Sequence, residues 1–396
     1  MRLSALFALY LVSTAATISM PFAIHKVQQV RLGIMPVNSE AALESAPTLH
    51  PGPRGPYQPI PACTGHDEME YYADRDFSFG SDVNDRRSFV PAIEVHSCAV
   101  GEDSTLYLAG GSDRKNWLRA YTPAAQLKWD VATDEIQSPL AVARDSTVYL
   151  ISMPRSGNTA LTAYTADGDA KWRVDLGGFE WNPVPPAVGP DGTIYVYSGV
   201  QSAPEIVAIT PEGQKLWKAS VLARVSKLVV GPDGTVFVDV PAGHVIAFSP
   251  QGRQLWSFYS DAHSPNGGIA VAGDGTVYFT SGFLHALDSS GKEKWNFKSE
   301  LTYTKGDYFD GTPVIAEDGT VYVASYYQQL YAVTPSGHKK WAYTGKSPDL
   351  PPEVMLTDDG VLRTRQGWFS VSSGLATKGW PAENHDNRNS RSREAQ

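Results

Sequence analysis

The stretch AITPEGQKLW at residues 208–217 returns as AFSPQGRQLW at 247–256 and as ALDSSGKEKW at 286–295. Each copy begins with an alanine and ends with a tryptophan nine residues later. Looser copies keep this spacing on both sides. The first residues are Ala120, Ala163, Ala208, Ala247, Ala286, Ala332 and Val371, and the tryptophans are Trp129, Trp172, Trp217, Trp256, Trp295, Trp341 and Trp380. Copies that recur every ~40–46 residues predict a repeat architecture.

A second element precedes each copy and reads PDGTIYV (190–196), PDGTVFV (232–238), GDGTVYF (273–279) or EDGTVYV (317–323). Looser versions are EDSTLYL (102–108), RDSTVYL (144–150) and DDGVLRT (358–364). Asp-Gly before a β-branched run favours a tight turn, because glycine tolerates positive φ and aspartate bonds the local backbone. Each unit therefore divides into four short antiparallel strands. Strand A precedes the Asp-Gly turn and strand B is the β-branched run after it. Strand C carries the repeat alanine and strand D the repeat tryptophan.

Four antiparallel strands at this period are typical of a propeller blade. We expect an all-β fold, a β-propeller of seven four-stranded antiparallel blades. Eight blades are the alternative, if residues 65–91 form an irregular blade together with the C-terminal tail. The A–B and C–D turns are short and are expected on one face. The B–C and D–A loops vary in length and are expected on the other, which we call the loop face.

The string Ala-x4-Gly-x3-Trp, also intact in AYTADGDAKW (163–172) and AVTPSGHKKW (332–341), resembles the repeat of the pyrroloquinoline-quinone (PQQ)-like β-propeller family. The resemblance covers roughly residues 91–382, and the tail GWPAENHDNRNS (379–390) is similar to a stretch that flanks blades in the family. It implies that the seven repeat tryptophans dock between adjacent blades and are structural.

The same family contains quinoprotein dehydrogenases and non-catalytic scaffolds, among them the propeller subunit of the bacterial outer-membrane β-barrel assembly machinery. The sequence lacks the adjacent cysteines of many alcohol-oxidising members, and its Asp-Gly elements lack the acidic spacing of a calcium loop. We therefore expect a scaffold with no catalytic residues, metal or cofactor. A small PQQ- and Ca²⁺-dependent sugar or alcohol oxidoreductase remains the alternative.

The N-terminus carries an export signal. An uncharged, largely apolar run follows Arg2 and ends in small residues, as in a secretory signal peptide. An uncleaved anchor is the alternative. We expect a signal or anchor at 1–23, a Pro-rich disordered tether at 24–62, an N-terminal extension at 63–90, the propeller at 91–382 and a polar tail at 383–396. Such a protein would be periplasmic or extracellular, held at a membrane only through an uncleaved N-terminus.

The two cysteines, Cys63 and Cys98, predict one disulfide in an exported chain, with two unpaired thiols as the alternative. The formal net charge of −9 disfavours nucleic-acid binding, which depends on basic patches.

The loop face is the candidate binding surface. Its expected aromatic residues are Trp117, Phe179, Trp181, Tyr259, His263, Tyr303, Tyr308, Phe309, Tyr326 and Tyr327. Aromatic residues in exposed loops supply binding hot spots. We expect them to bind a protein partner in the cell envelope. A glycan ligand, or closure of the propeller channel by these side chains, is the alternative.

Overall fold

The computed structural model describes residues 44–50, the strands between 63 and 91, and residues 95–382 except for short gaps. The gaps are 113–114, 156, 179–183, 201–202, 222, 262–266, 301, 303–305, 310, 328, 346–353 and 365–366. The chain divides into Met1–Pro36 and Val37–Gln396, and every described residue belongs to the second part. The expected signal or anchor at 1–23 and the tail at 383–396 lie outside the described residues. Within the described residues, no helix has the length and apolar character needed to cross a membrane.

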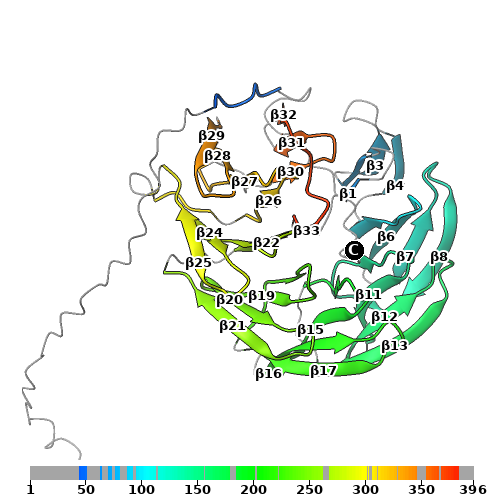
Figure 1. Ribbon diagram of the computed structural model, residues 1–396. Coiled ribbons are helices and arrows are strands. Elements are labelled where there is room, and N and C mark those ends of the chain that lie inside the picture. Colours follow the sequence, from blue (N-terminus) through cyan, green and yellow to red (C-terminus); the bar gives the residue numbers. More distant parts are fainter. Residues whose placement is uncertain are drawn as a thin grey trace, which may run out of the picture. The chain divides into compact units, whose positions relative to one another are not determined.

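Seven antiparallel sheets follow the seven repeat units, in chain order (Figure 1). Unit one holds β5 (Val95–Val100), β6 (Leu106–Ser112), β7 (Lys115–Tyr121) and β8 (Leu127–Thr133). Unit two holds β9 (Glu135–Ile136), β10 (Ala141–Val142), β11 (Val148–Met153), β12 (Thr159–Tyr164) and β13 (Ala170–Gly177). Unit three holds β14 (Ala187–Val188), β15 (Ile194–Val200), β16 (Ala203–Ile209) and β17 (Lys215–Ser220). Unit four holds β18 (Lys227–Val230), β19 (Val236–Val240), β20 (His244–Phe248) and β21 (Gln254–Tyr259).

The remaining units follow the same order. Unit five holds β22 (Gly268–Ala272), β23 (Val277–Ser281), β24 (Phe283–Leu287) and β25 (Glu293–Phe297). Unit six holds β26 (Val314–Ile315), β27 (Val321–Ala324), β28 (Gln329–Val333) and β29 (Lys339–Thr344). Unit seven holds β30 (Val354–Leu356), β31 (Val361–Thr364) and β32 (Gly367–Ser370). The predicted β-propeller is confirmed.

A further sheet forms ahead of the repeats. It holds β1 (Cys63–Thr64), β2 (Glu70–Ala73), β3 (Asp76–Gly80) and β4 (Arg87–Pro91). This is the segment for which an irregular eighth blade was the alternative. Cys98 in β5 is disulfide-bonded, and the one other cysteine of the sequence is Cys63 in β1.

Each A–B turn depends on one residue with positive φ. In unit three this residue is Gly192, at φ +82°, and Asp191 accepts a hydrogen bond from the backbone N–H of Thr193 at 3.0 Å. Units one and two place Ser104 and Ser146 at the same point, at φ +58° and +62°. The turn therefore keeps its shape where the sequence departs from Asp-Gly.

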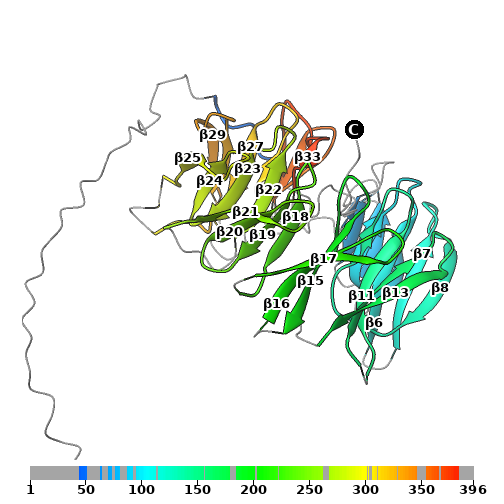
Figure 2. The same ribbon diagram turned by 60° about the horizontal axis from the view of Figure 1, so that its bottom comes forward.

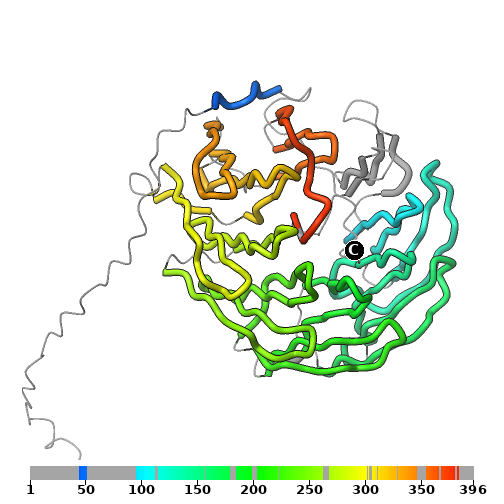
Figure 3. Tube along the Cα trace, viewed as in Figure 1, coloured from blue at the N-terminus to red at the C-terminus, as the bar shows by residue number. Residues whose placement is uncertain are grey.

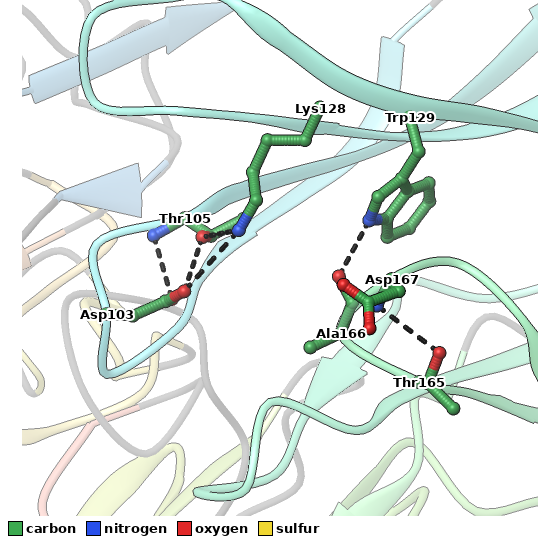
Figure 4. Close-up of polar contacts among 7 residues, drawn as sticks. All are labelled: Asp103, Thr105, Lys128, Trp129, Thr165, Ala166 and Asp167. Carbon is green, nitrogen blue, oxygen red and sulfur yellow. Dashed lines mark hydrogen bonds and ion pairs between the residues drawn. The ribbon is translucent and has the colours of Figure 1, made fainter.

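Neighbouring units are joined through the repeat tryptophans. Trp129 of unit one donates its indole N–H to the carbonyl oxygen of Ala166 in unit two at 2.7 Å (Figure 4). Equivalent bonds run from Trp172, Trp217, Trp256 and Trp295 to Pro211, Pro250, Ser289 and Pro335, at 2.7–2.9 Å. Each ring also packs on an aromatic side chain of its own B strand, as Trp129 does on Tyr107.

The core is continuous from one unit to the next. Residues of units one and two, for example, pack in one cluster. Figure 2 shows the strands of these two units side by side. Because both faces of a blade are covered, an inner strand such as β19 is buried along its whole length. The outer D strands instead alternate between half-buried and exposed residues, as in β17 and β21.

Unit seven does not take its outer strand from its own repeat. The backbones of His50 and Trp368 exchange two hydrogen bonds, so residue 50 lies along β32 at the edge of the sheet. In the tube, the segment 44–50 (blue) lies near the orange and red segments of units six and seven (Figure 3). Ala46 and Leu49 pack against the core of units six and seven. The described part of the expected disordered tether, residues 44–50, is therefore built into the propeller.

Trp380 departs from the repeat pattern. Its backbone, in β33 (Gly379–Trp380), pairs with Val271 of β22 in unit five rather than with β32. The preceding residues run beside β26, where Leu375 bridges to Ala316. The prediction that Trp380 stands in the outer D strand of its own unit is thus wrong, because β33 pairs with the A strand of unit five.

Candidate functional site

The connection from β25 to β26 forms the base of the candidate site. The backbone of Phe309 exchanges two hydrogen bonds of 3.0 Å with Gly282 and also bridges to Ser325. It therefore runs as a strand between the B–C turns of units five and six. The Phe309 ring is fully buried and packs against Phe297. Phe309 is a core residue, which corrects its expected place among exposed aromatic residues.

A buried carboxylate fixes the same connection. Asp307 accepts a hydrogen bond from the backbone N–H of Tyr327 at 2.9 Å and another from the hydroxyl of Ser299. The backbone N–H of Tyr326 donates to the carbonyl oxygen of Tyr308 at 2.9 Å. These bonds tie the β25–β26 connection to the β27–β28 turn, so the side chains that both carry are held in place.

Three tyrosines stand on this base, and we call Tyr308, Tyr326 and Tyr327 the tyrosine platform. The rings of Tyr308 and Tyr326 stack with their centroids 4.9 Å apart and their planes 14° apart. Tyr327 meets Tyr326 edge to face at 5.5 Å. Tyr326 is 44% exposed and Tyr327 is 38% exposed. Ordered aromatic rings that remain accessible bind a partner with little loss of side-chain entropy.

Two other expected aromatic residues are described by the structure, and both lie outside the platform, in units one and four. Trp117 lies within β7 rather than in a loop and is buried, with the guanidinium of Arg119 4.1 Å from its ring centroid. It is therefore not part of an exposed surface. Tyr259 ends β21 and is 56% exposed. The remaining four, Phe179, Trp181, His263 and Tyr303, lie outside the described residues.

A hydrogen-bonded chain that the sequence did not reveal joins units four and five. The Oγ of Ser260 lies 3.0 Å from Nε2 of His285, and Nδ1 of His285 lies 2.6 Å from Oε1 of Glu293. Burial alone would raise the pKa of Glu293, but the hydrogen bond and charge of His285 outweigh it and hold that pKa below its usual value.

The order serine, histidine and carboxylate matches a nucleophilic triad. Here, however, Ser260 and His285 are both buried, and Phe258, Phe279 and Phe283 surround the imidazole. The backbone N–H of Ser260 is also used, since it donates to the carbonyl oxygen of Gly243 at 2.8 Å. The chain therefore links the end of β21 in unit four to β24 in unit five through buried groups.

One more buried carboxylate lies in unit four. Asp239 sits within β19 and accepts a hydrogen bond from the hydroxyl of Ser226 at 2.8 Å. Burial raises the pKa of Asp239 to about 6, against the opposing effects of that hydrogen bond and of the charge of Lys227. Among the described residues, no three His, Cys, Asp or Glu side chains gather in a group that could hold a metal ion.

A family model described as outer membrane protein assembly factor BamB matches residues 157–362, more than half of the chain. The matched range runs from the C strand of unit two to the B strand of unit seven. No curated protein matches the sequence.

Several solved structures are similar. BamB from Moraxella catarrhalis is 19% identical, with 70% of this chain and 84% of that chain covered, at a TM-score of 0.48. A catalytically inactive virginiamycin B lyase from Staphylococcus aureus is 12% identical, with 72% and 94% covered, at 0.50. The C-terminal WD40 domain of Sif2 is 15% identical, with 84% and 97% covered, at 0.56. At such identities the likeness shows the fold alone.

Proposed function

The chain belongs to the family of the outer membrane protein assembly factor BamB, and from this premise we propose that it is an exported, non-catalytic scaffold that binds a protein partner in the cell envelope. The observation that carries the proposal is the tyrosine platform. It combines accessible aromatic rings with a base fixed by the backbone of Phe309 and the buried carboxylate of Asp307. A surface of this kind can bind a partner without catalysing a reaction.

The platform has the features of an interface anchor. Aromatic residues carry much of the energy of protein interfaces, and loss of one anchor costs about 2 kcal/mol or more, roughly a thirtyfold loss of affinity. The formal net charge of −9 disfavours a polyanion as the partner.

The proposal is tested by cross-linking and affinity capture from envelope extract with Tyr308, Tyr326 and Tyr327 all changed to alanine. Phe309 is left unchanged because it belongs to the core. Leu127→Ala is the matched control, since it also removes an exposed apolar side chain (54% exposed) but lies in unit one. We expect a captured protein to be lost with the triple variant and kept with the control, while both variants unfold at the wild-type urea concentration.

Two outcomes would reject the proposal. Equal capture by the triple variant and the wild type would remove the platform from the interface. Retention of the wild type on a polysaccharide resin, abolished by the triple variant, would assign the platform to a glycan instead.

A further inference from the structure

The outer strands of the units differ at one repeated position, the residue before the docking tryptophan. Units one, two, five and six carry Lys128, Lys171, Lys294 and Lys340 there. The first three amines donate to the threonine hydroxyl of their own A–B turn, at 2.9–3.1 Å. Figure 4 shows this bond from Lys128 to Thr105. Lys340 lies 3.6 Å from Asp318 of its turn. Four units thus place a lysine amine at the A–B turn.

Units three and four carry leucine at the same position. Leu216 is 54% exposed and Leu255 is 40% exposed. The turn carboxylates are still present, because Asp191 accepts from Thr193 and Asp233 accepts from Thr235, as in the other units. No lysine or arginine of the described part of the chain pairs with either carboxylate. Two successive blades therefore combine an exposed leucine with a carboxylate that lacks the amine found in the sister blades.

The outer strand of unit four extends this surface. The sequence of β21, QLWSFY, contains no charged residue, and Leu255, Ser257 and Tyr259 project from the same side of it and are exposed. β21 ends its sheet, and its strand partner among the described strands is β20. Charged side chains, lysine above all, usually protect such an edge from pairing with another chain.

We propose that the outer edge of β21, with Leu216 and Leu255 and the carboxylates of Asp191 and Asp233, is a second docking surface. Its occupant is an extended segment of another protein that carries apolar residues and a lysine or arginine on the same side of the strand. The apolar side chains cover the exposed leucines, and the basic side chain takes the place of the lysine that units three and four lack. This surface is separate from the tyrosine platform, so the scaffold would hold two partners at once.

The probe is a labelled synthetic peptide in which leucine and threonine alternate and one lysine replaces the central leucine. The control peptide has glutamate in place of that lysine. Fluorescence anisotropy should show binding of the lysine peptide about tenfold tighter than binding of the glutamate peptide. Hydrogen exchange on the complex should protect the amides of 254–259.

The decisive variant is Leu255→Lys, which gives unit four the residue of its sister blades. It should lower affinity for the lysine peptide about tenfold while its thermal midpoint stays at or above that of the wild type, because the new amine meets Asp233. Leu255→Met is the matched control and should bind as the wild type does. Equal affinity for the two peptides, or unchanged binding by Leu255→Lys, would overturn the proposal. The platform triple variant should bind the lysine peptide normally, so either proposal can fail alone.

Discussion

The indole nitrogen of Trp217 lies 2.7 Å from the carbonyl oxygen of Pro250, so a single hydrogen bond joins the outer strand of unit three to the C–D turn of unit four. The turn comes this close because Gly252 has no side chain. A Cβ there would lie 2.5 Å from the indole ring. The stability of a repeat array is close to a sum of such nearest-neighbour terms.

Replacing Trp217 should therefore destabilise the whole propeller. We expect Trp217→Ala to lower the free energy of unfolding by about 3 kcal/mol, since it removes a large packed side chain between two blades. Trp217→Phe keeps much of the packing but loses the bond to Pro250, and should cost about 1 kcal/mol from that bond. Urea denaturation measures both. A Trp217→Ala loss no larger than that of Trp217→Phe would contradict the docking role.

The glycine beneath the ring gives a second prediction with an internal control. Gly252 and Gly275 both have φ +82°, but a Cβ at Gly275 would meet nothing within 4 Å. Gly275→Ala should thus lower the free energy of unfolding only by the energy needed to place alanine in the left-handed conformation, about 1–2 kcal/mol. Gly252→Ala should cost at least about 1 kcal/mol more, because the ring must also shift. If both variants lost the same free energy of unfolding, the close approach of Gly252 to the Trp217 ring would not explain why glycine is needed there.

Asp239 should make stability depend on pH. Its pKa is about 6 in the folded protein, against the ordinary aspartate value of 3.8 expected in the unfolded chain, so the folded state binds the proton more tightly than the unfolded state. The stabilisation that Asp239 gives the folded state is therefore fully present below pH 3.8 and is lost as the pH rises through 6. Asp239→Asn keeps an acceptor for Ser226 and stays neutral. The free energy of unfolding of Asp239→Asn should exceed that of the wild type by about 2–3 kcal/mol at pH 7 and match it near pH 4.

The measurement is urea denaturation at several pH values between 4 and 7. Asp261→Asn, at an exposed position, controls for the loss of one negative charge. If the difference between Asp239→Asn and the wild type stayed constant over this range, Asp239 would not titrate as described.

The blades could be predicted because the residues that define them act locally. The positive φ of Gly192 and the contact between Trp217 and Gly252 both follow from short motifs, which repeat at a fixed spacing. All three platform residues, Tyr308, Tyr326 and Tyr327, are among the predicted loop aromatics, and Tyr326 and Tyr327 are exposed in the structure. Phe309 differs because its backbone pairs with two turns, which draws its ring into the core.

Contacts between distant segments could not be predicted. The chain from Ser260 through His285 to Glu293 depends on where the end of β21 meets unit five, which no motif encodes. The missing amines of units three and four were visible in the sequence, since Leu216 and Leu255 replace lysine. The role of the lysine at this position, however, could be inferred only from the contacts that Lys128 and Lys171 make with the A–B turns of their own units.

Closure of unit seven by the N-terminal segment gives the last prediction. The imidazole of His50 stacks on Trp368 with centroids 4.1 Å apart, their backbones exchange hydrogen bonds of 2.9 and 3.1 Å, and Leu49 packs on the core beneath. A chain that begins at residue 51 should unfold at a clearly lower temperature than one that begins at residue 44. Leu49 is only partly buried, so its burial contributes about 1 kcal/mol.

Differential scanning calorimetry compares the two truncated chains, and a synthetic peptide of residues 44–50 tests the shorter one for recovery. The peptide should raise the unfolding temperature of the chain that begins at residue 51, because binding to the folded state stabilises it by mass action. It should have no effect on the longer chain, whose edge is already filled. Identical unfolding temperatures for the two chains would mean that β30, β31 and β32 complete unit seven without this strand.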